Sequence, residues 1–191
     1  HYQHALTHRE ETTEFDVGHA IHALVLGVGA DIVEIPYDSY RTQAARDARD
    51  EAYAAGKTPV KTAQLEPVRA AAEAVLSHPT ARSWLELPGE VEVPLFAADP
   101  DTGVDIRGKL DKLADLSGRP VPVDLKTVTD AREGPFFRAV RDYDYDLQAA
   151  LYRHLVRLTG LGDPTPAVVI AAEKVPPYDV AVYQLSHEDI V

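Results

Sequence analysis

The sequence contains no cysteine and no methionine, and no apolar run approaches the ~20 residues that cross a membrane. Without cysteine, disulfide frameworks, cysteine zinc sites, iron–sulfur clusters and thiol nucleophiles are excluded. No basic and apolar signal segment opens the chain, and no helicase P-loop is present. We therefore expect no membrane partner and no motor activity in this chain.

The first residue is histidine, and the chain has 191 residues. A chain that lacks an initial methionine is expected to be part of a longer one. Its length predicts one domain. We expect a single domain over residues 1–191, with a helical N-terminal part at about 1–88 and a sheet with further helices at about 89–185.

Acidic residues outnumber basic ones by 31 to 19, which gives a net charge of −12. Such an excess argues against loose, sequence-independent binding of nucleic acid. Residues 107–157 differ, because they hold ten Lys or Arg and eight Asp or Glu. A protein that gathers carboxylates around divalent ions can also bind polyanions, because the ions supply positive charge. The net charge therefore weakens a DNA hypothesis without excluding it.

Hydrophobic periodicity predicts a mixed order of helices and strands. Helices are expected over 16–26, 39–55, 63–76, 134–140 and 145–158, and strands over 90–96, 104–116, 121–127, 168–172 and 180–185. Short turns join the first three strands, which predicts an antiparallel meander. The fold class is therefore α/β of the α+β kind, a mixed central sheet flanked by helices.

Two neighbouring strands carry acids that a packed sheet disfavours. Asp111 lies between leucines, and Asp124 lies two residues before Lys126, on the same strand face. A hairpin could bring the two carboxylates together, where they would need a cation or a proton between them. Two carboxylates that share a cation, together with a lysine, are the groups that metal-assisted phosphodiester hydrolysis requires. A solvated ion pair on an exposed sheet face would produce the same tripeptide.

These residues, together with three other short patterns, resemble the PD-(D/E)XK nuclease superfamily. Twelve residues separate Asp111 from Asp124-Leu125-Lys126-Thr127. Gly18-His19-Ala20-Ile21-His22 resembles a Gly-x-x-x-His helix, and Gln148-Ala149-Ala150-Leu151-Tyr152 resembles a Gln-x-x-x-Tyr helix. Within the superfamily, the set is most similar to phage and prophage exonucleases related to exodeoxyribonuclease VIII (the RecE-like group). Lambda exonuclease is a more distant relative.

The resemblance implies a metal site on four residues. His22, Asp111 and Asp124 would bind the ion through their side chains, and Leu125 through its backbone carbonyl. Such ligands suit a hard cation, Mg²⁺ or Mn²⁺. Without the resemblance, His22 could equally be a histidine at the boundary of the core.

The resemblance also implies catalytic roles beyond the metal ligands. Lys126 would orient or activate the attacking water, and Gln148 and Tyr152 would line the site from one helix face. Asp111 and Asp124 would act with them. Glu90 and Glu92 point the same way by strand parity, and either could add a further acid, Glu92 being preferred.

The activity implied is that of a Mg²⁺-dependent exodeoxyribonuclease, a hydrolase that resects duplex DNA ends 5′ to 3′ for phage-type DNA recombination. The partners would be DNA ends, a single-strand annealing protein and copies of the chain in a ring, in the cytoplasm of a bacterial host cell. An endonuclease or structure-specific nuclease on the same fold, and a non-catalytic DNA-binding module, are the alternatives.

Overall fold

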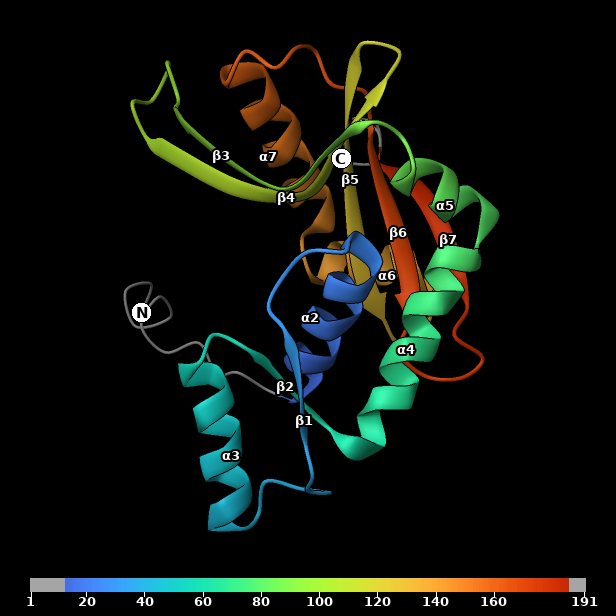
Figure 1. Cartoon of the computed structure of the whole chain (residues 1–191). Coiled ribbons are helices and arrows are strands. Elements are labelled where there is room, and N and C mark those ends of the chain that lie inside the picture. Colours follow the sequence, from blue (N-terminus) through green and yellow to red (C-terminus); the bar gives the residue numbers. More distant parts are fainter. Residues whose placement is uncertain (1–12, 186–191) are drawn as a thin grey trace.

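The computed structural model describes residues 13–185, and its centre is a five-stranded sheet flanked by helices (Figure 1). The strand order is β3-β4-β5-β6-β7, and β1 and β2 form a separate parallel pair. The strands are β1 (Ile32–Ile35), β2 (Thr58–Lys61), β3 (Gly89–Ala98), β4 (Asp105–Leu116), β5 (Arg119–Val128), β6 (Ala167–Glu173) and β7 (Val180–Leu185). The helices are α2 (Thr13–Leu26), α3 (Gln43–Ala54), α4 (Thr62–Ser77), α5 (Pro79–Leu85), α6 (Glu133–Asp142) and α7 (Tyr145–Leu158).

The sheet is mixed, as the sequence predicts. Strands β3, β4 and β5 form the expected antiparallel meander, and β6 pairs with β7 in the same manner. Strand β6 instead runs parallel to β5, because α6 and α7 carry the chain back before β6 begins. The predicted α+β fold class with a meander in a mixed sheet is therefore confirmed.

Helices α2 and α4 cover one face of the sheet. Ile21 of α2 and Val75 of α4 pack with Val123 and Leu125 of β5 in one buried cluster. Because side chains alternate along a strand, Asp124 and Lys126 belong to the opposite side of β5. Val123 and Leu125, the neighbours of Asp124 in the sequence, thus anchor β5 in the core, and the Asp124 side chain lies on the other face of the strand.

Helices α6 and α7 occupy the other side. Phe136 of α6 is fully buried and stacks on Tyr183 of β7, with ring centroids 4.3 Å apart. Helix α7 supports the β3–β4 hairpin, because Leu155 packs with Leu95 and Leu110 in a separate buried cluster. In the described part of the chain, no helix is long and apolar enough to cross a membrane.

Three elements, β1, β2 and α5, were not expected from the sequence. Residues 58–61 form β2 by pairing with β1, although Pro59 disfavours a strand. Proline is tolerated here because β2 is an edge strand of its two-stranded sheet. Helix α5 starts directly after the break at His78, whose side chain caps it by accepting from the Ala81 N–H. The predicted helix over 39–55 is shorter and begins at Gln43, after its cap Thr42.

Gly108 sets how closely the β3–β4 hairpin approaches α7. A Cβ atom on it would lie 2.8 Å from Leu155 Cδ1 and 3.1 Å from Tyr152 Cε1. We expect Gly108→Ala to lower the free energy of unfolding by about 1–3 kcal/mol, because these buried side chains have little room to move. Gly134→Ala is the control, since only Arg138 Nη1, at 3.9 Å, would be near its Cβ. Equal urea-unfolding curves for both variants would contradict this account.

Candidate active site

Strand β4 leaves β5 where Asp111 meets Asp124. The pairing of the two strands ends at Lys112 and Val123, and the same register would place Asp111 opposite Asp124. Here the N–H of Leu125 donates to Asp111 Oδ2 at 2.8 Å. A carboxylate thus accepts a backbone hydrogen bond beyond the end of the ladder, and the strands part around two acids.

Helix α2 brings His22 to this point. Gly18, one turn before His22, lies against β5, where a Cβ atom would be 3.2 Å from Thr127 Oγ1. The absence of a side chain at Gly18 therefore permits the close approach of α2 to the strand. His22 Nδ1 lies 3.5 Å from Asp111 Oδ2. The predicted reach of His22 to the acids is present in the structure.

Lys126 extends from β5 toward α7. Its ammonium nitrogen lies 2.8 Å from Asp124 Oδ2 and donates to Gln148 Oε1 at 2.5 Å. The same nitrogen is 4.8 Å from the centre of the Tyr145 ring, a cation–π distance. Three neighbours thus hold the ammonium group, whose side chain is only 17% exposed.

A chain of hydrogen bonds continues from Lys126 across α7. Gln148 Nε2 donates to the Tyr152 hydroxyl at 3.0 Å, and this hydroxyl donates to the Lys109 carbonyl at 2.9 Å. Gln148 and Tyr152 share a helix face, as their spacing predicts. The structure therefore joins both residues to Lys126, and joins α7 to β4. Tyr152 is buried, which raises the pKa of its hydroxyl above the ordinary value and keeps it a donor.

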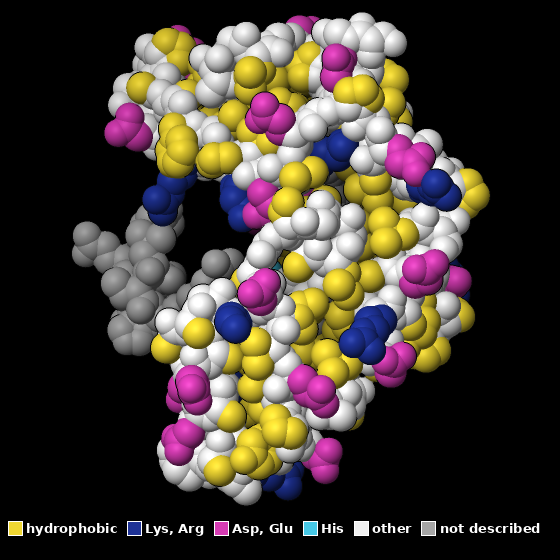
Figure 2. All heavy atoms as spheres, viewed as in Figure 1, with side chains coloured by type: hydrophobic (Ala, Val, Ile, Leu, Met, Phe, Trp, Pro, Cys, Tyr) yellow, Lys and Arg dark blue, Asp and Glu magenta, His cyan; other side chains and the backbone are white. Residues whose placement is uncertain are grey.

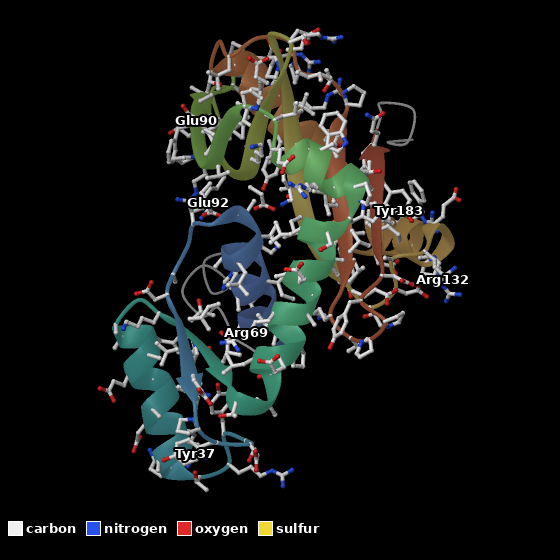
Figure 3. All side chains as sticks on the ribbon, turned by 45° about the vertical axis from the view of Figure 1, so that its right-hand side comes forward. Tyr37, Arg69, Glu90, Glu92, Arg132 and Tyr183 are labelled. Atoms are coloured by element: carbon white, nitrogen blue, oxygen red, sulfur yellow. The ribbon has the colours of Figure 1, made fainter. Side chains whose placement is uncertain are left out.

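A cavity of about 750 Å³ lies between α2, β4, β5 and α7, and His22, Asp111, Lys126 and Gln148 are among the residues that border it. Glu92 and Lys109 form an ion pair at its edge. Glu90 instead borders a second, smaller cavity, and Figure 3 shows the two glutamates apart, with Glu92 on the side of α2. The expectation that both point the same way is wrong, because the positive φ of Glu92 (55°) interrupts the strand alternation.

Burial and mutual charge set the ionisation of the acids in opposite directions. Burial, strengthened by the charge of Asp111 and only partly offset by Lys126, raises the pKa of Asp124 to about 6. Burial alone would also raise the pKa of Asp111, but His22 and the Leu125 N–H lower it overall. Burial would lower the pKa of His22, yet the hydrogen bond and charge of Asp111 raise it. The His22–Asp111 pair is thus stabilised as an ion pair, and Asp124 holds its proton more firmly.

The raised pKa of Asp124 predicts that this carboxylate destabilises the fold near neutral pH. The folded protein releases the proton near pH 6 and the unfolded chain near pH 3.8, so stability falls as pH rises through this window. Without bound metal, Asp124→Asn should raise the free energy of unfolding relative to wild type, by at most ~3 kcal/mol above about pH 6 and by little near pH 4.

Urea unfolding in EDTA at both ends of this window measures the difference, and Asp105→Asn, an exposed aspartate of β4, is the matched control. A gain that stays constant or shrinks as pH rises would contradict a raised pKa at Asp124.

Comparison with known proteins places this arrangement in a family. Residues 1–191 match the family described as "PDDEXK-like domain of unknown function (DUF3799)". The chain belongs to this PDDEXK-like family. No curated protein matches the sequence significantly.

Among solved structures, the chain is similar to a protein from Eubacterium rectale named "Putative exonuclease", with a TM-score of 0.62 and 15% identity. The match covers 96% of this chain and 62% of that protein, so the chain spans less than two thirds of it. The structure of SSO0001 matches with a TM-score of 0.40 and 15% identity, covering 96% of this chain and 72% of the other. A TM-score of 0.40 supports no inference, whereas the first match supports the PDDEXK-like fold.

PDDEXK nucleases generally use divalent metals. The carboxylates, the backbone carbonyl and the imidazole found here are groups that can bind such an ion. Asp124 Oδ2 is buried and makes no hydrogen bond within residues 13–185, although the Lys126 ammonium lies beside it. Across the same residues, however, no group of three or more His, Asp or Glu side chains is arranged to hold a metal. An ion would therefore depend on Asp111 and Asp124 together with the Leu125 carbonyl, His22 and oxygens of water or substrate.

Two residues of the site were not singled out from the sequence. Tyr145 lies against Lys126, and the Lys109 carbonyl ends the hydrogen-bond chain from Gln148. The position of Tyr145, three residues before Gln148 on the same helix face, is a signal that could have found it. Nothing in the sequence marks Lys109, because a backbone carbonyl has no residue signature.

Proposed function

We propose that this PDDEXK-like domain is a metal-dependent deoxyribonuclease. The observation that carries the proposal is that Asp111 and Lys126 border one cavity where β4 leaves β5, with the Lys126 ammonium held between the buried Asp124 and Gln148. A solvated ion pair on a sheet face would not be buried or bridged to a second element. The name of the Eubacterium rectale protein supports a nuclease in the same direction.

The chemistry follows from the positions of these side chains. The Lys126 ammonium orients a water molecule toward the phosphorus and stabilises the charge that develops on the phosphate. The water oxygen forms a bond to phosphorus as the bond to the leaving sugar oxygen breaks; the water loses a proton and the leaving oxygen takes one up. Gln148, fixed by Tyr152, keeps Lys126 in place. A bound Mg²⁺ or Mn²⁺ would supply Lewis-acid stabilisation of the phosphate.

Within this class we favour an exonuclease that resects duplex ends 5′ to 3′, as in the RecE-like phage enzymes. Support comes from the Gly-x-x-x-His and Gln-x-x-x-Tyr patterns, whose side chains His22, Gln148 and Tyr152 all reach the cavity or its hydrogen-bond chain. A role in phage recombination, an annealing-protein partner, a ring-shaped oligomer and a bacterial cytoplasmic location belong to the same proposal.

Digestion of DNA of different topology tests the proposal. Linear duplexes labelled at the 5′ or the 3′ end, and a covalently closed circle, are incubated with the chain and Mn²⁺. A 5′-to-3′ exonuclease releases the 5′ label first and leaves the circle intact. Cleavage of the circle would show an endonuclease instead. Binding of DNA without any cleavage would favour the alternative of a non-catalytic DNA-binding module, and would overturn the proposed activity.

A further inference from the structure

The β3–β4 hairpin has two faces of different character. Its inner face carries the side chains that pack on α7. On its outer face Phe96 lies directly opposite Arg107, and Pro94 lies opposite Lys109. All four of these outer residues are exposed, and the Phe96 side chain is 68% exposed. We name these four residues the outer hairpin face.

The outer hairpin face is continuous with the candidate active site. Lys109 borders the cavity, and Arg107 lies two residues farther along β4 on the same strand face, about 7 Å away. Figure 2 shows Lys and Arg side chains at the edge of the hollow beneath the hairpin. A ligand that leaves the cavity along β4 therefore meets Lys109 first, and then Arg107 and Phe96.

Folding does not account for these side chains. Phe96 is exposed on the face turned away from α7, so it takes no part in the packing that holds the hairpin against α7. Arg107 makes no ion pair with any other residue in the described range, whereas Lys109 pairs with Glu92. A free guanidinium beside a large exposed ring, in a protein of net charge −12, marks a local surface suited to an anionic ligand with aromatic rings.

We propose that the outer hairpin face binds a single-stranded segment of the DNA substrate, with phosphates on Arg107 and Lys109 and one base stacked on Phe96. This inference rests on the proposed nuclease function. Unpaired bases offer their flat faces to aromatic side chains, and cations follow the backbone. In an intact duplex the bases are already stacked on one another, so a single strand is the form of DNA that Phe96 can use.

Fluorescence anisotropy tests the proposal with the full chain in EDTA. Lys126→Ala serves as background, so that the labelled strand stays uncut. On this background, Phe96→Ala should weaken binding of a single strand about tenfold, and Phe96→Tyr should restore it. Arg107→Gln should reduce the slope of log affinity against log salt by about 0.7. Arg119→Gln removes the same charge at the far end of β5 and should change nothing.

The outcomes separate this inference from the nuclease proposal. Unchanged single-strand affinity in both Phe96→Ala and Arg107→Gln would overturn the inference, while cleavage by the wild-type chain would leave the nuclease standing. Equal losses for a blunt duplex and a single strand would also overturn it, because Phe96 would then not be reading unpaired bases. A wild-type chain that neither cleaves nor binds DNA would contradict both the nuclease proposal and the proposed single-strand binding. Thermal unfolding of each variant is the control for the fold, and these surface changes should leave the unfolding temperature unchanged.

Discussion

Replacing Lys126 by alanine is expected to reduce DNA cleavage by about 10²- to 10⁴-fold, while DNA affinity changes by only a few-fold. The ammonium group lies 2.8 Å from Asp124 Oδ2 and donates to Gln148, so it points into the cavity and away from bulk solvent. Preorganised charge of this kind acts strongly on the transition state, because no reorganisation is needed when the phosphate charge develops. Arginine should not restore activity, since its planar guanidinium is larger and cannot occupy the same place.

The substitution also leaves Asp124 buried without its ion pair, which costs stability. Thermal unfolding must therefore accompany the cleavage assay, and rates are compared at a temperature where both proteins are folded. Lys174→Ala is the matched control, because Lys174 follows β6, outside the residues that border the cavity. A Lys126→Ala protein that is folded and cleaves within about tenfold of wild type would remove Lys126 from the mechanism.

Removal of divalent metal is expected to abolish cleavage, and Mg²⁺ or Mn²⁺ should restore it. Asp111 and Asp124 lie on parted strands, and Leu125 directly follows Asp124 in the sequence. The two carboxylates and the Leu125 carbonyl offer the hard oxygen atoms that such ions prefer. Cation binding should also raise the free energy of unfolding, by about 2.7 kcal/mol at a concentration 100 times the Kd. This second effect does not depend on substrate or on turnover.

Asp111→Asn should lose both the metal-dependent cleavage and the metal-dependent rise in thermal stability. Asp105→Asn removes a carboxylate from the same strand, outside the residues that border the cavity, and should retain both. Metal ions that stabilise Asp111→Asn as much as wild type would place the ion elsewhere. Full cleavage in EDTA would exclude a metal-dependent mechanism.

Long elements with a clear period could be predicted from sequence. Helix α7 has the expected bounds, Tyr145–Leu158, because its leucines recur at helical spacing, and β7 likewise matches at Val180–Leu185. The meander followed from alternating strands and short turns. The tight turn between β4 and β5 also set which residues oppose each other, so the approach of Asp111 to Asp124 was predictable.

Short elements and local backbone exceptions could not be predicted in this way. Four residues, including Pro59, form β2 only because β1 lies beside them. Strand parity placed Glu90 with Glu92, yet the positive φ of Glu92 turns the two apart. Such a φ is rare for a residue with a side chain, and pattern reasoning has no signal for it.

The residue types of the site and the faces that carry them follow from the order of amino acids, because helical and strand periods depend only on neighbours along the chain. The parting of β4 from β5, the bridge from Lys126 through Gln148 to Tyr152, and the exposure of Phe96 beside Arg107 were decided by packing. Packing of α2 against β5 and of α7 against the hairpin sets distances between segments far apart in the chain. Such distances depend on how whole surfaces fit together, and a local period carries no information about that fit.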